Sequence, residues 1–165
     1  MTGAIEIANA SAGQVEDARQ LFNESWIKTY SPIIGDETTR ELIAKKHAAE
    51  VFARQALEPD HIFLVALDGD TVVGHVYGFP QDGFYIDRLH VKPTRKGQGI
   101  GRPLIDAVIA RRPHGERLWL DVLLGNDQAM GFYGRVGFTR GGQTDACGGL
   151  AGIPAVIYEM TVQRR

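Results

Sequence analysis

Apolar residues recur at helical spacing in the first third of the chain. They are Val15, Ala18, Phe22 and Trp26. Ser11 and Gln14 form a capping box, so we expect a helix to begin near Ser11. Pro32 and Gly35 interrupt the pattern, and residues 37–57 return to a helical composition. Two N-terminal helices are therefore predicted.

The pattern then changes to one that is typical of strands. Residues 61–67, 71–79 and 84–91 are rich in β-branched and aromatic side chains. The intervening segments "DGD" and "PQDG" contain Asp-Gly pairs, which suit tight turns. Together these features predict a three-stranded antiparallel meander.

Helices and strands alternate in the second half. Residues 100–112 predict a helix with Pro103 in its first turn, where a missing N–H is tolerated. The segment "RLWLDVLL" predicts a buried strand, and a short helix should follow, capped by Asn126 and ended by Gly137. Two more strands joined by a glycine-rich loop complete the pattern. Because no repeat or linker interrupts it, we expect residues 1–165 to form a single domain.

Composition narrows the classes of partner. The 165 residues are 44% hydrophobic and 23% charged, with a net charge of -2, so we expect neither nucleic acid nor a membrane as a partner. Cys147 is the only cysteine, which excludes an internal disulfide and a cysteine-rich metal site. We expect a cytoplasmic protein without a bound metal, since no leader or membrane-spanning pattern is present.

One short segment carries a chemical signal. In "VKPTRKGQGIG", residues 91–101, three glycines lie where a strand ends and a helix begins. Glycines let successive N–H groups point in one direction, and the helix N-terminus adds partial positive charge. Arg95, Lys96 and Arg102 add basic side chains. The segment therefore predicts a site for a phosphate or pyrophosphate, although a tight turn with solvated basic residues is an alternative.

Two familiar phosphate-binding loops do not match this spacing. A nucleotide P-loop requires Lys-Ser/Thr after its last glycine, whereas Gly101 is followed by Arg102 and Pro103. A dinucleotide fingerprint requires Gly-x-Gly-x-x-Gly, whereas here the glycines are Gly97, Gly99 and Gly101. A nucleotide-binding protein is thus a poor interpretation.

The same loop resembles the GNAT superfamily of acetyltransferases, whose signature is Gln/Arg-x-x-Gly-x-Gly/Ala. Lys96 replaces the usual Gln or Arg, and Pro103 is a second departure. The stretch "LWLDVLLGNDQAMGFYGRVGF" resembles a later motif of the family. Its matching residues are Asn126, Ala129, Phe132, Tyr133, Gly137 and Phe138.

The resemblance implies an α/β fold of the α+β type. Its central sheet would be mixed and mostly antiparallel, with six to seven strands flanked by about four helices. It also implies acetyl transfer from acetyl-CoA to a primary amine by direct attack in a ternary complex. Asn126 would contact the pantetheine arm and Tyr133 the thioester sulfur. The other implied coenzyme-binding residues are Leu89, His90, Val91, Lys96, Gly97, Gln98, Gly99, Ile100, Gly101 and Arg102.

The general base is less clearly indicated. Strand alternation places Tyr85, Asp87, Leu89 and Val91 on one face. Tyr85 occupies the position where several members carry a glutamate, so Asp87 is the candidate catalytic carboxylate, with Glu24, Glu37, Asp121 or a water chain left open. His90 has the opposite parity and is interpreted as a packing residue.

For the acceptor we expect a small-molecule amine bound by Trp26, Tyr30 and Tyr85, because aromatic rings hold cations. Core packing is the alternative for Trp26. Alternatives for function are a non-catalytic acyl-CoA sensor and an enzyme that acts on a protein or peptide amine. A homodimer is left open.

Overall fold

The structure, a computed structural model, describes residues 3–147 and 150–163. These residues form seven strands: β1 (Ile5–Asn9), β2 (Ile62–Asp68), β3 (Thr71–Pro80), β4 (Phe84–Val91), β5 (Arg117–Leu123), β6 (Thr139–Cys147) and β7 (Leu150–Thr161). They are hydrogen-bonded in the order β1-β2-β3-β4-β5-β7-β6. Four neighbouring pairs (β1/β2, β2/β3, β5/β7 and β6/β7) are antiparallel, and β4/β5 is parallel. The predicted mixed, mostly antiparallel sheet of an α/β protein is confirmed, and the described part of the chain contains five α-helices where about four were expected.

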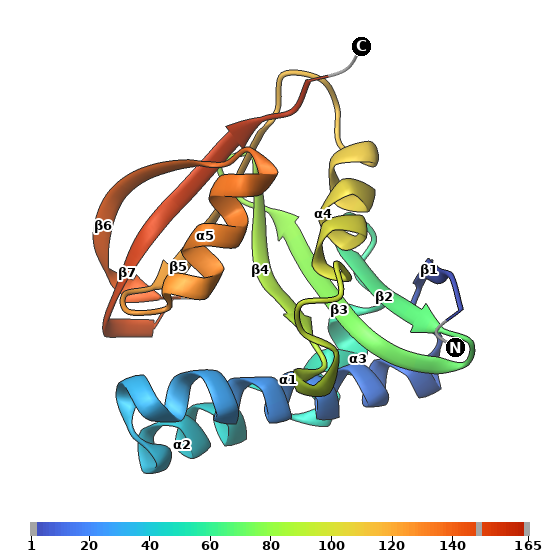
Figure 1. The fold of residues 1–165 in the computed structure, drawn as a ribbon, viewed down its shortest axis with the longest axis horizontal. Helices are drawn as coiled ribbons and strands as arrows, with labels where there is room; N and C mark the ends of the chain where they lie inside the picture. The colour runs from blue at the N-terminus through green and yellow to red at the C-terminus, as the bar shows by residue number, and fades with distance from the viewer. Residues whose placement is uncertain (1–2, 148–149, 164–165) are drawn as a thin grey trace. The chain divides into compact units, whose positions relative to one another are not determined.

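The chain divides into two compact units. The first comprises the described residues up to Gly78 together with Arg88–Ala110, and the second Phe79–Asp87 together with the described residues from Arg111 onward. Figure 1 labels the helices and strands of both units. In chain order the helices are α1 (Ala12–Ile34), α2 (Asp36–Lys46), α3 (Ala49–Gln55), the 3-10 turn η1 (Pro93–Arg95), α4 (Gly101–Ala110) and α5 (Asp127–Val136).

Helix α1 begins as predicted. The Ser11 hydroxyl accepts a hydrogen bond from the Gln14 N–H, and the Gln14 side chain accepts one from the Ser11 N–H, which satisfies two of the unpaired donors at the helix start. Pro32 lies inside the last turn, and the helix ends at Gly35, whose φ is 93°. Glycine suits that backbone conformation because it has no Cβ.

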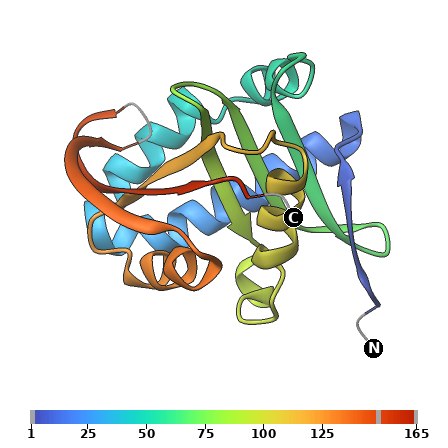
Figure 2. The same cartoon turned by 90° about the horizontal axis from the view of Figure 1, so that it is seen from above.

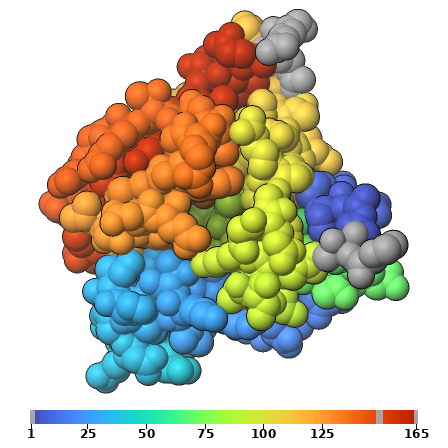
Figure 3. Space-filling model, in the orientation of Figure 1, coloured from blue at the N-terminus to red at the C-terminus, as the bar shows by residue number. Residues whose placement is uncertain are grey.

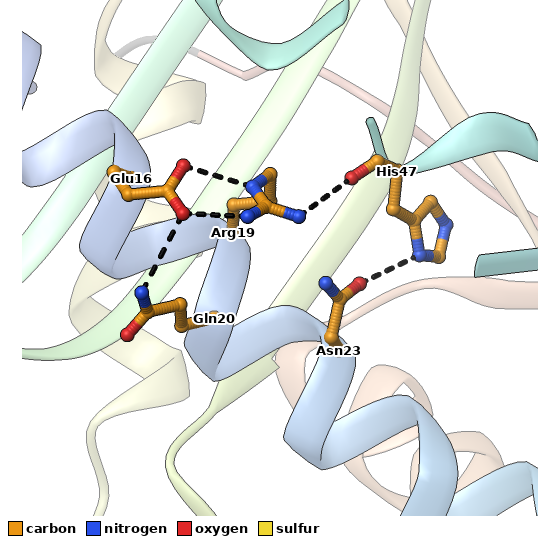
Figure 4. Close-up of polar contacts among 5 residues, drawn as sticks. All are labelled: Glu16, Arg19, Gln20, Asn23 and His47. Carbon is orange, nitrogen blue, oxygen red and sulfur yellow. Dashed lines mark hydrogen bonds and ion pairs between the residues drawn. The ribbon is translucent and has the colours of Figure 1, made fainter. Parts of the chain in front are cut away.

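The prediction of one helix over residues 37–57 is wrong, because this region forms two helices, α2 and α3, with a break at His47. Contacts from α1 hold this break, as Figure 4 shows. Arg19 donates a hydrogen bond to the His47 carbonyl at 3.2 Å, and the His47 ring donates one to the Asn23 amide oxygen at 3.1 Å. These contacts are remote in sequence, so the helical composition of 37–57 could not reveal the break.

Both faces of β2 and β3 are covered in the first unit. A Cβ on Gly74 of β3 would lie 3.0 Å from Leu104 of α4, so this helix packs directly on the strand. On the other face, the Phe52 ring of α3 packs against Phe63 and His75 at 6.1 Å in each case. Figure 2 shows the strands between α4 and the N-terminal helices. Coverage on both faces explains why β2 is apolar almost throughout.

The second unit begins its ladder at the start of β4. Phe84 and Tyr85 pair with Leu118 and Trp119 of β5 in parallel register. Strand β5 then pairs with β7 along its whole length. The segment predicted as a glycine-rich loop is mostly strand, because β6 and β7 extend to Cys147 and from Leu150.

Candidate functional site

The loop between β4 and α4 has the backbone shape of an anion site. Gly97 and Gly99 have φ values of 80° and 76°, and alternation of such residues with ordinary ones makes successive N–H groups converge. Within the part of the chain that the structure describes, no group accepts a hydrogen bond from the N–H groups of residues 97–100. The segment is on the surface (Figure 3), where Lys96 to Gly99 are exposed. The loop therefore presents several N–H donors next to the start of α4.

The basic side chains of Arg95, Lys96 and Arg102, at and just after the loop, are not equivalent. Arg95 forms an ion pair with Asp68 at 3.0 Å and Arg102 pairs with Asp106 at 3.2 Å, so the positive charge expected from both is partly neutralised. Lys96 instead donates a hydrogen bond to the Thr29 hydroxyl of α1 at 3.3 Å. Burial of its ammonium group, followed by the nearby charge of Lys28, lowers the pKa of Lys96.

The end of β4 leads directly into this loop. Leu89, His90 and Val91 are half-buried, and the ring of His90 points toward α1, where it forms a hydrogen bond with the Ser25 hydroxyl at 2.9 Å. Burial, with the positive charges of Lys96 and Arg88, lowers the pKa of His90 to about 3. His90 is thus neutral near pH 7 and packs edge-on against Phe22, as strand alternation predicts.

Helix α5 positions Asn126 and Tyr133 in the second unit. The Asn126 amide oxygen caps the helix by accepting a hydrogen bond from the Ala129 N–H at 3.3 Å, and Gly137 ends it in the left-handed conformation. Tyr133 packs against Phe132, Phe138 and Tyr158. Burial raises the pKa of Tyr133, so its hydroxyl remains protonated over the physiological range.

A polar cluster surrounds Tyr85 in the same unit. The Tyr85 hydroxyl donates a hydrogen bond to Oδ1 of Asp121 at 2.9 Å, and the Cys147 thiol lies 3.9 Å from the same oxygen. Asp87 is two residues from Tyr85 and therefore on the same face of β4. Burial, then the charges of Asp121 and Asp87, raises the pKa of the Tyr85 hydroxyl strongly. Tyr85 is thus a hydrogen-bond donor and not a base.

The remaining predicted acceptor residues lie in the first unit. The Trp26 ring packs edge-on against Tyr30 at 4.6 Å and against His47 at 4.8 Å, and Tyr30 lies 6.4 Å from His90. Trp26 also contacts the core residue Phe22. Both rings are only half-buried, so one side of this aromatic group is accessible while the other packs into the core.

Comparison with known proteins identifies the family. A family model described as Acetyltransferase (GNAT) family matches residues 15–138. The chain belongs to this family. Among relatives of this GNAT protein, the peptidyl-lysine N-acetyltransferase YjaB of Escherichia coli is 26% identical over 66% of the chain and 71% of its own length. The N-alpha-acetyltransferase RimI of Mycobacterium tuberculosis is 32% identical over 55% of the chain and 60% of its own.

Solved structures agree with the fold. The crystal structure of PaiA N-acetyltransferase from Thermoplasma acidophilum in complex with coenzyme A matches this GNAT protein with a TM-score of 0.77 and 24% identity. The match covers 96% of this chain and 99% of that one. At this identity the likeness concerns the fold. With the family match, it makes this GNAT protein an acyltransferase.

Two further findings concern metal ions and membranes. Among residues 3–147 and 150–163, no group of three or more His, Cys, Asp or Glu side chains is arranged to hold a metal ion. The helices of those residues include none that is long and apolar enough to cross a membrane.

Sequence analysis left Asp121 as one of several carboxylates and assigned no role to Cys147. The contact of Tyr85 with Asp121 depends on the β4/β5 register, and that of Cys147 with Asp121 depends on β6. Neither feature has a local sequence signal.

Proposed function

We propose that this protein transfers an acetyl group from acetyl-CoA to a primary amine by direct attack in a ternary complex. The observation that carries the proposal is the row of N–H groups at residues 97–100, which have no acceptor among the described residues and lie next to the N-terminus of α4. Such a site suits a diphosphate, because each N–H can donate to a phosphate oxygen and the helix end adds partial positive charge. Lys96 supplies a full positive charge at the same place. The coenzyme, when bound, supplies a thioester-activated acetyl group.

The coenzyme-binding residues divide by the part of the ligand they would contact. Gly97, Gln98, Gly99, Ile100 and Gly101 with Lys96 and Arg102 would hold the diphosphate. We assign the backbone of Leu89, His90 and Val91 to the acetyl-pantetheine end, where an N–H can donate to the thioester oxygen as negative charge develops. Asn126 is assigned to the pantetheine arm.

Tyr133 is assigned to the departing sulfur. Its raised pKa keeps the hydroxyl protonated, and it can therefore donate a hydrogen bond to the thiolate. A tyrosine has an ordinary pKa of about 10 and a thiol of about 8.5, so complete proton transfer is uphill by about 2 kcal/mol. Hydrogen bonding is consequently the main contribution that we expect from this residue.

The acceptor amine must lose a proton before it attacks. An alkyl amine with a pKa near 10.4 is only about one part in a thousand neutral at pH 7, which corresponds to roughly 4–5 kcal/mol. The acetyl carbon leaves sulfur and bonds to nitrogen, while the two protons lost by the ammonium group go to the thiolate and to solvent. We assign the general base to Asp87, because Tyr85 keeps its own proton.

Two classes of acceptor fit this proposal. Trp26, Tyr30 and Tyr85 favour a small cationic amine through their aromatic rings. A peptide or protein amine is the second candidate, and the names of the relatives YjaB and RimI favour it. The two classes share the primary amine as the reacting group.

The deciding experiment measures release of the coenzyme A thiol over a panel of diamines, amino acids, aminoglycosides and peptides. Tyr133→Phe should lower kcat about tenfold or more with little change in the KM for acetyl-CoA. Tyr158→Phe is the matched control, since it removes a hydroxyl from the same packing cluster. Failure of the native protein to bind acetyl-CoA would contradict the assignment of the loop, and binding without turnover on any amine would contradict the assignment as a transferase.

A further inference from the structure

Asp121 is held in a defined orientation on the half-exposed face of β5. The buried residues Leu118, Leu120 and Val122 alternate with Trp119 and Asp121, which are half-buried. Tyr85 directs its hydroxyl to Oδ1 of Asp121 at 2.9 Å. Because the Tyr85 side chain is only 4% exposed, its ring is fixed by packing, and the hydrogen bond fixes the carboxylate.

Asp87 brings a second carboxylate to the same region. Tyr85 pairs with Trp119 in the parallel β4/β5 ladder. Asp87 and Asp121 each lie two residues further along their strand, so alternation places both on the same face as Tyr85 and Trp119. Both carboxylates contribute to the raised pKa of the Tyr85 hydroxyl, which agrees with this placement.

Aromatic rings and a neutralised cation complete the surroundings. Tyr85 packs against Trp119 at 4.6 Å and against Phe79 at 5.5 Å. Arg117 lies over the Trp119 ring but forms an ion pair with Glu159 at 2.7 Å. The face around Tyr85 therefore combines two carboxylates with aromatic surface, and its nearby arginine is already paired.

We propose that Asp121, positioned by Tyr85, binds the ammonium group of the acceptor, and that Asp121 and Asp87 together select amines without a neighbouring carboxylate. The inference rests on the proposed function and names the substrate class of that site. A carboxylate accepts charge-assisted hydrogen bonds from an ammonium group. A free amino acid brings its own carboxylate beside two others, and like charges at such distances repel. Alkyl and arylalkyl amines escape that repulsion.

Matched substrate pairs test this selection. Each pair consists of an amino acid and its decarboxylated amine: lysine with 1,5-diaminopentane, tyrosine with tyramine, and tryptophan with tryptamine. In the native protein, we expect kcat/KM to be about tenfold or more higher for the amine of each accepted pair, since only the amino acid carries a carboxylate that Asp87 and Asp121 repel. Equal kcat/KM values within the pairs, or a preference for the amino acids, would overturn the inference while leaving the transferase assignment intact.

Three variants test which residues cause the preference for amines over amino acids. Asp121→Asn should raise the KM for the amine about tenfold and reduce the preference within pairs, with the KM for acetyl-CoA unchanged. Tyr85→Phe should reduce the same preference more weakly, because it removes only the positioning hydroxyl. Asp145→Asn is the control: Asp145 lies exposed on β6 of the same unit, and the variant makes the same change of charge and should keep the preference.

The outcomes separate the two proposals. If Asp121→Asn loses all turnover, its acetyl-CoA affinity and circular dichroism spectrum decide between local and global damage, and Tyr85→Phe then carries the test. An unchanged preference in both Asp121→Asn and Tyr85→Phe overturns the role of Asp121. No turnover by the native protein with either member of any pair, or with peptides, overturns the proposed function and this inference with it.

Discussion

At the scale of single residues, Lys96 occupies a position where the family usually has Gln or Arg. Its ammonium group donates a hydrogen bond to Thr29 of α1 and, unlike the side chains of Arg95 and Arg102, forms no ion pair with a described residue. A compact ammonium supplies charge without the planar fork of arginine. Lys96 therefore contributes mainly through charge.

Lys96→Ala should raise the KM for acetyl-CoA about tenfold, since one charge-assisted contact is lost. Lys96→Arg should stay within about threefold of the native value because the charge remains. Higher salt should weaken acetyl-CoA binding by the native protein more than binding by Lys96→Ala. Lys45→Ala, on the exposed end of α2, is the control for a general change of charge. Equal salt dependence of the native protein and Lys96→Ala would contradict a role in binding phosphate.

Arg88 illustrates a residue whose role is structural. Its side chain is 4% exposed, lies over the Phe52 and Tyr77 rings at 4.0 and 4.3 Å, and donates hydrogen bonds to Gln55 and to the His75 ring. His75 accepts through Nε2 because its Nδ1–H donates to the Leu64 carbonyl. The guanidinium group thus joins β4 to β3 and α3.

Arg88→Met should lower the free energy of unfolding by about 2–4 kcal/mol, because it leaves buried acceptors without their donor. Urea denaturation of the purified variant measures this directly. The control is Arg40→Met on α2, where the arginine is 60% exposed, and its effect should stay below about 0.5 kcal/mol. A similar stability of both variants would show that the buried arginine is dispensable.

At the scale of elements, the loop before α4 depends on backbone conformation. Gly97 and Gly99 have positive φ, yet a Cβ at either position would meet open space. The cost of a side chain there is therefore backbone strain, which is roughly 1–2 kcal/mol per residue. Relief of that strain would turn the N–H groups away from one another.

Gly99→Ala should raise the KM for acetyl-CoA about tenfold while the free energy of unfolding falls by no more than about 2 kcal/mol. Gly13→Ala is a matched control in the first turn of α1, where alanine favours the helix and should leave the KM unchanged. Enzyme assays and thermal denaturation of both variants provide the comparison. Native affinity in Gly99→Ala would show that the loop does not act through converging N–H groups.

Local sequence signals predicted the elements well where caps and turns were explicit. Ser11 with Gln14, and Asn126 with Gly137, marked the ends of two helices correctly. The break at His47 escaped prediction because Arg19 and α1 hold it from elsewhere in the chain. The full lengths of β6 and β7 were not predicted for a related reason, because pairing between strands overrides the turn preference of their glycines.

For the candidate site, sequence likewise indicated what is continuous along the chain and missed contacts between separate elements. The glycine spacing before α4 and the α5 motif identified the residues proposed to bind the coenzyme, because both are continuous in sequence. The pairing of Arg95 with Asp68 and of Tyr85 with Asp121 was not predictable, since each joins separate elements. The acceptor side is therefore where structure adds most to sequence.

At the scale of the molecule, buried neutral histidines couple folding to pH. Burial lowers the pKa of His47 to about 2 and that of His90 to about 3, and lowers the pKa of the fully buried His75 well below its usual range. The unfolded chain binds protons at these histidines below about pH 6.5. The free energy of unfolding is therefore highest, with respect to these histidines, above that pH, and it falls as the pH drops toward 3.

At pH 5, His47 and His90 should each reduce the free energy of unfolding by about 2 kcal/mol relative to pH 7. All three histidines belong to the first unit, where Trp26 packs against His47 at 4.8 Å. The fluorescence of Trp26 in a Trp119→Phe variant should thus report acid unfolding, with urea midpoints measured between pH 7 and pH 4. A midpoint that does not change over this range would contradict neutral burial of the histidines.

Strand β6 also has a consequence for self-association. It ends the strand order, and its pairing with β7 shifts register between Arg140 and Gln143 and again between Thr144 and Ala146. A regular outer strand is a template onto which a strand from another molecule can add, and such irregularities blunt it. This edge is therefore poorly suited to edge-to-edge aggregation, and strand addition between two copies of this protein would be better served by β1 at the opposite end of the strand order.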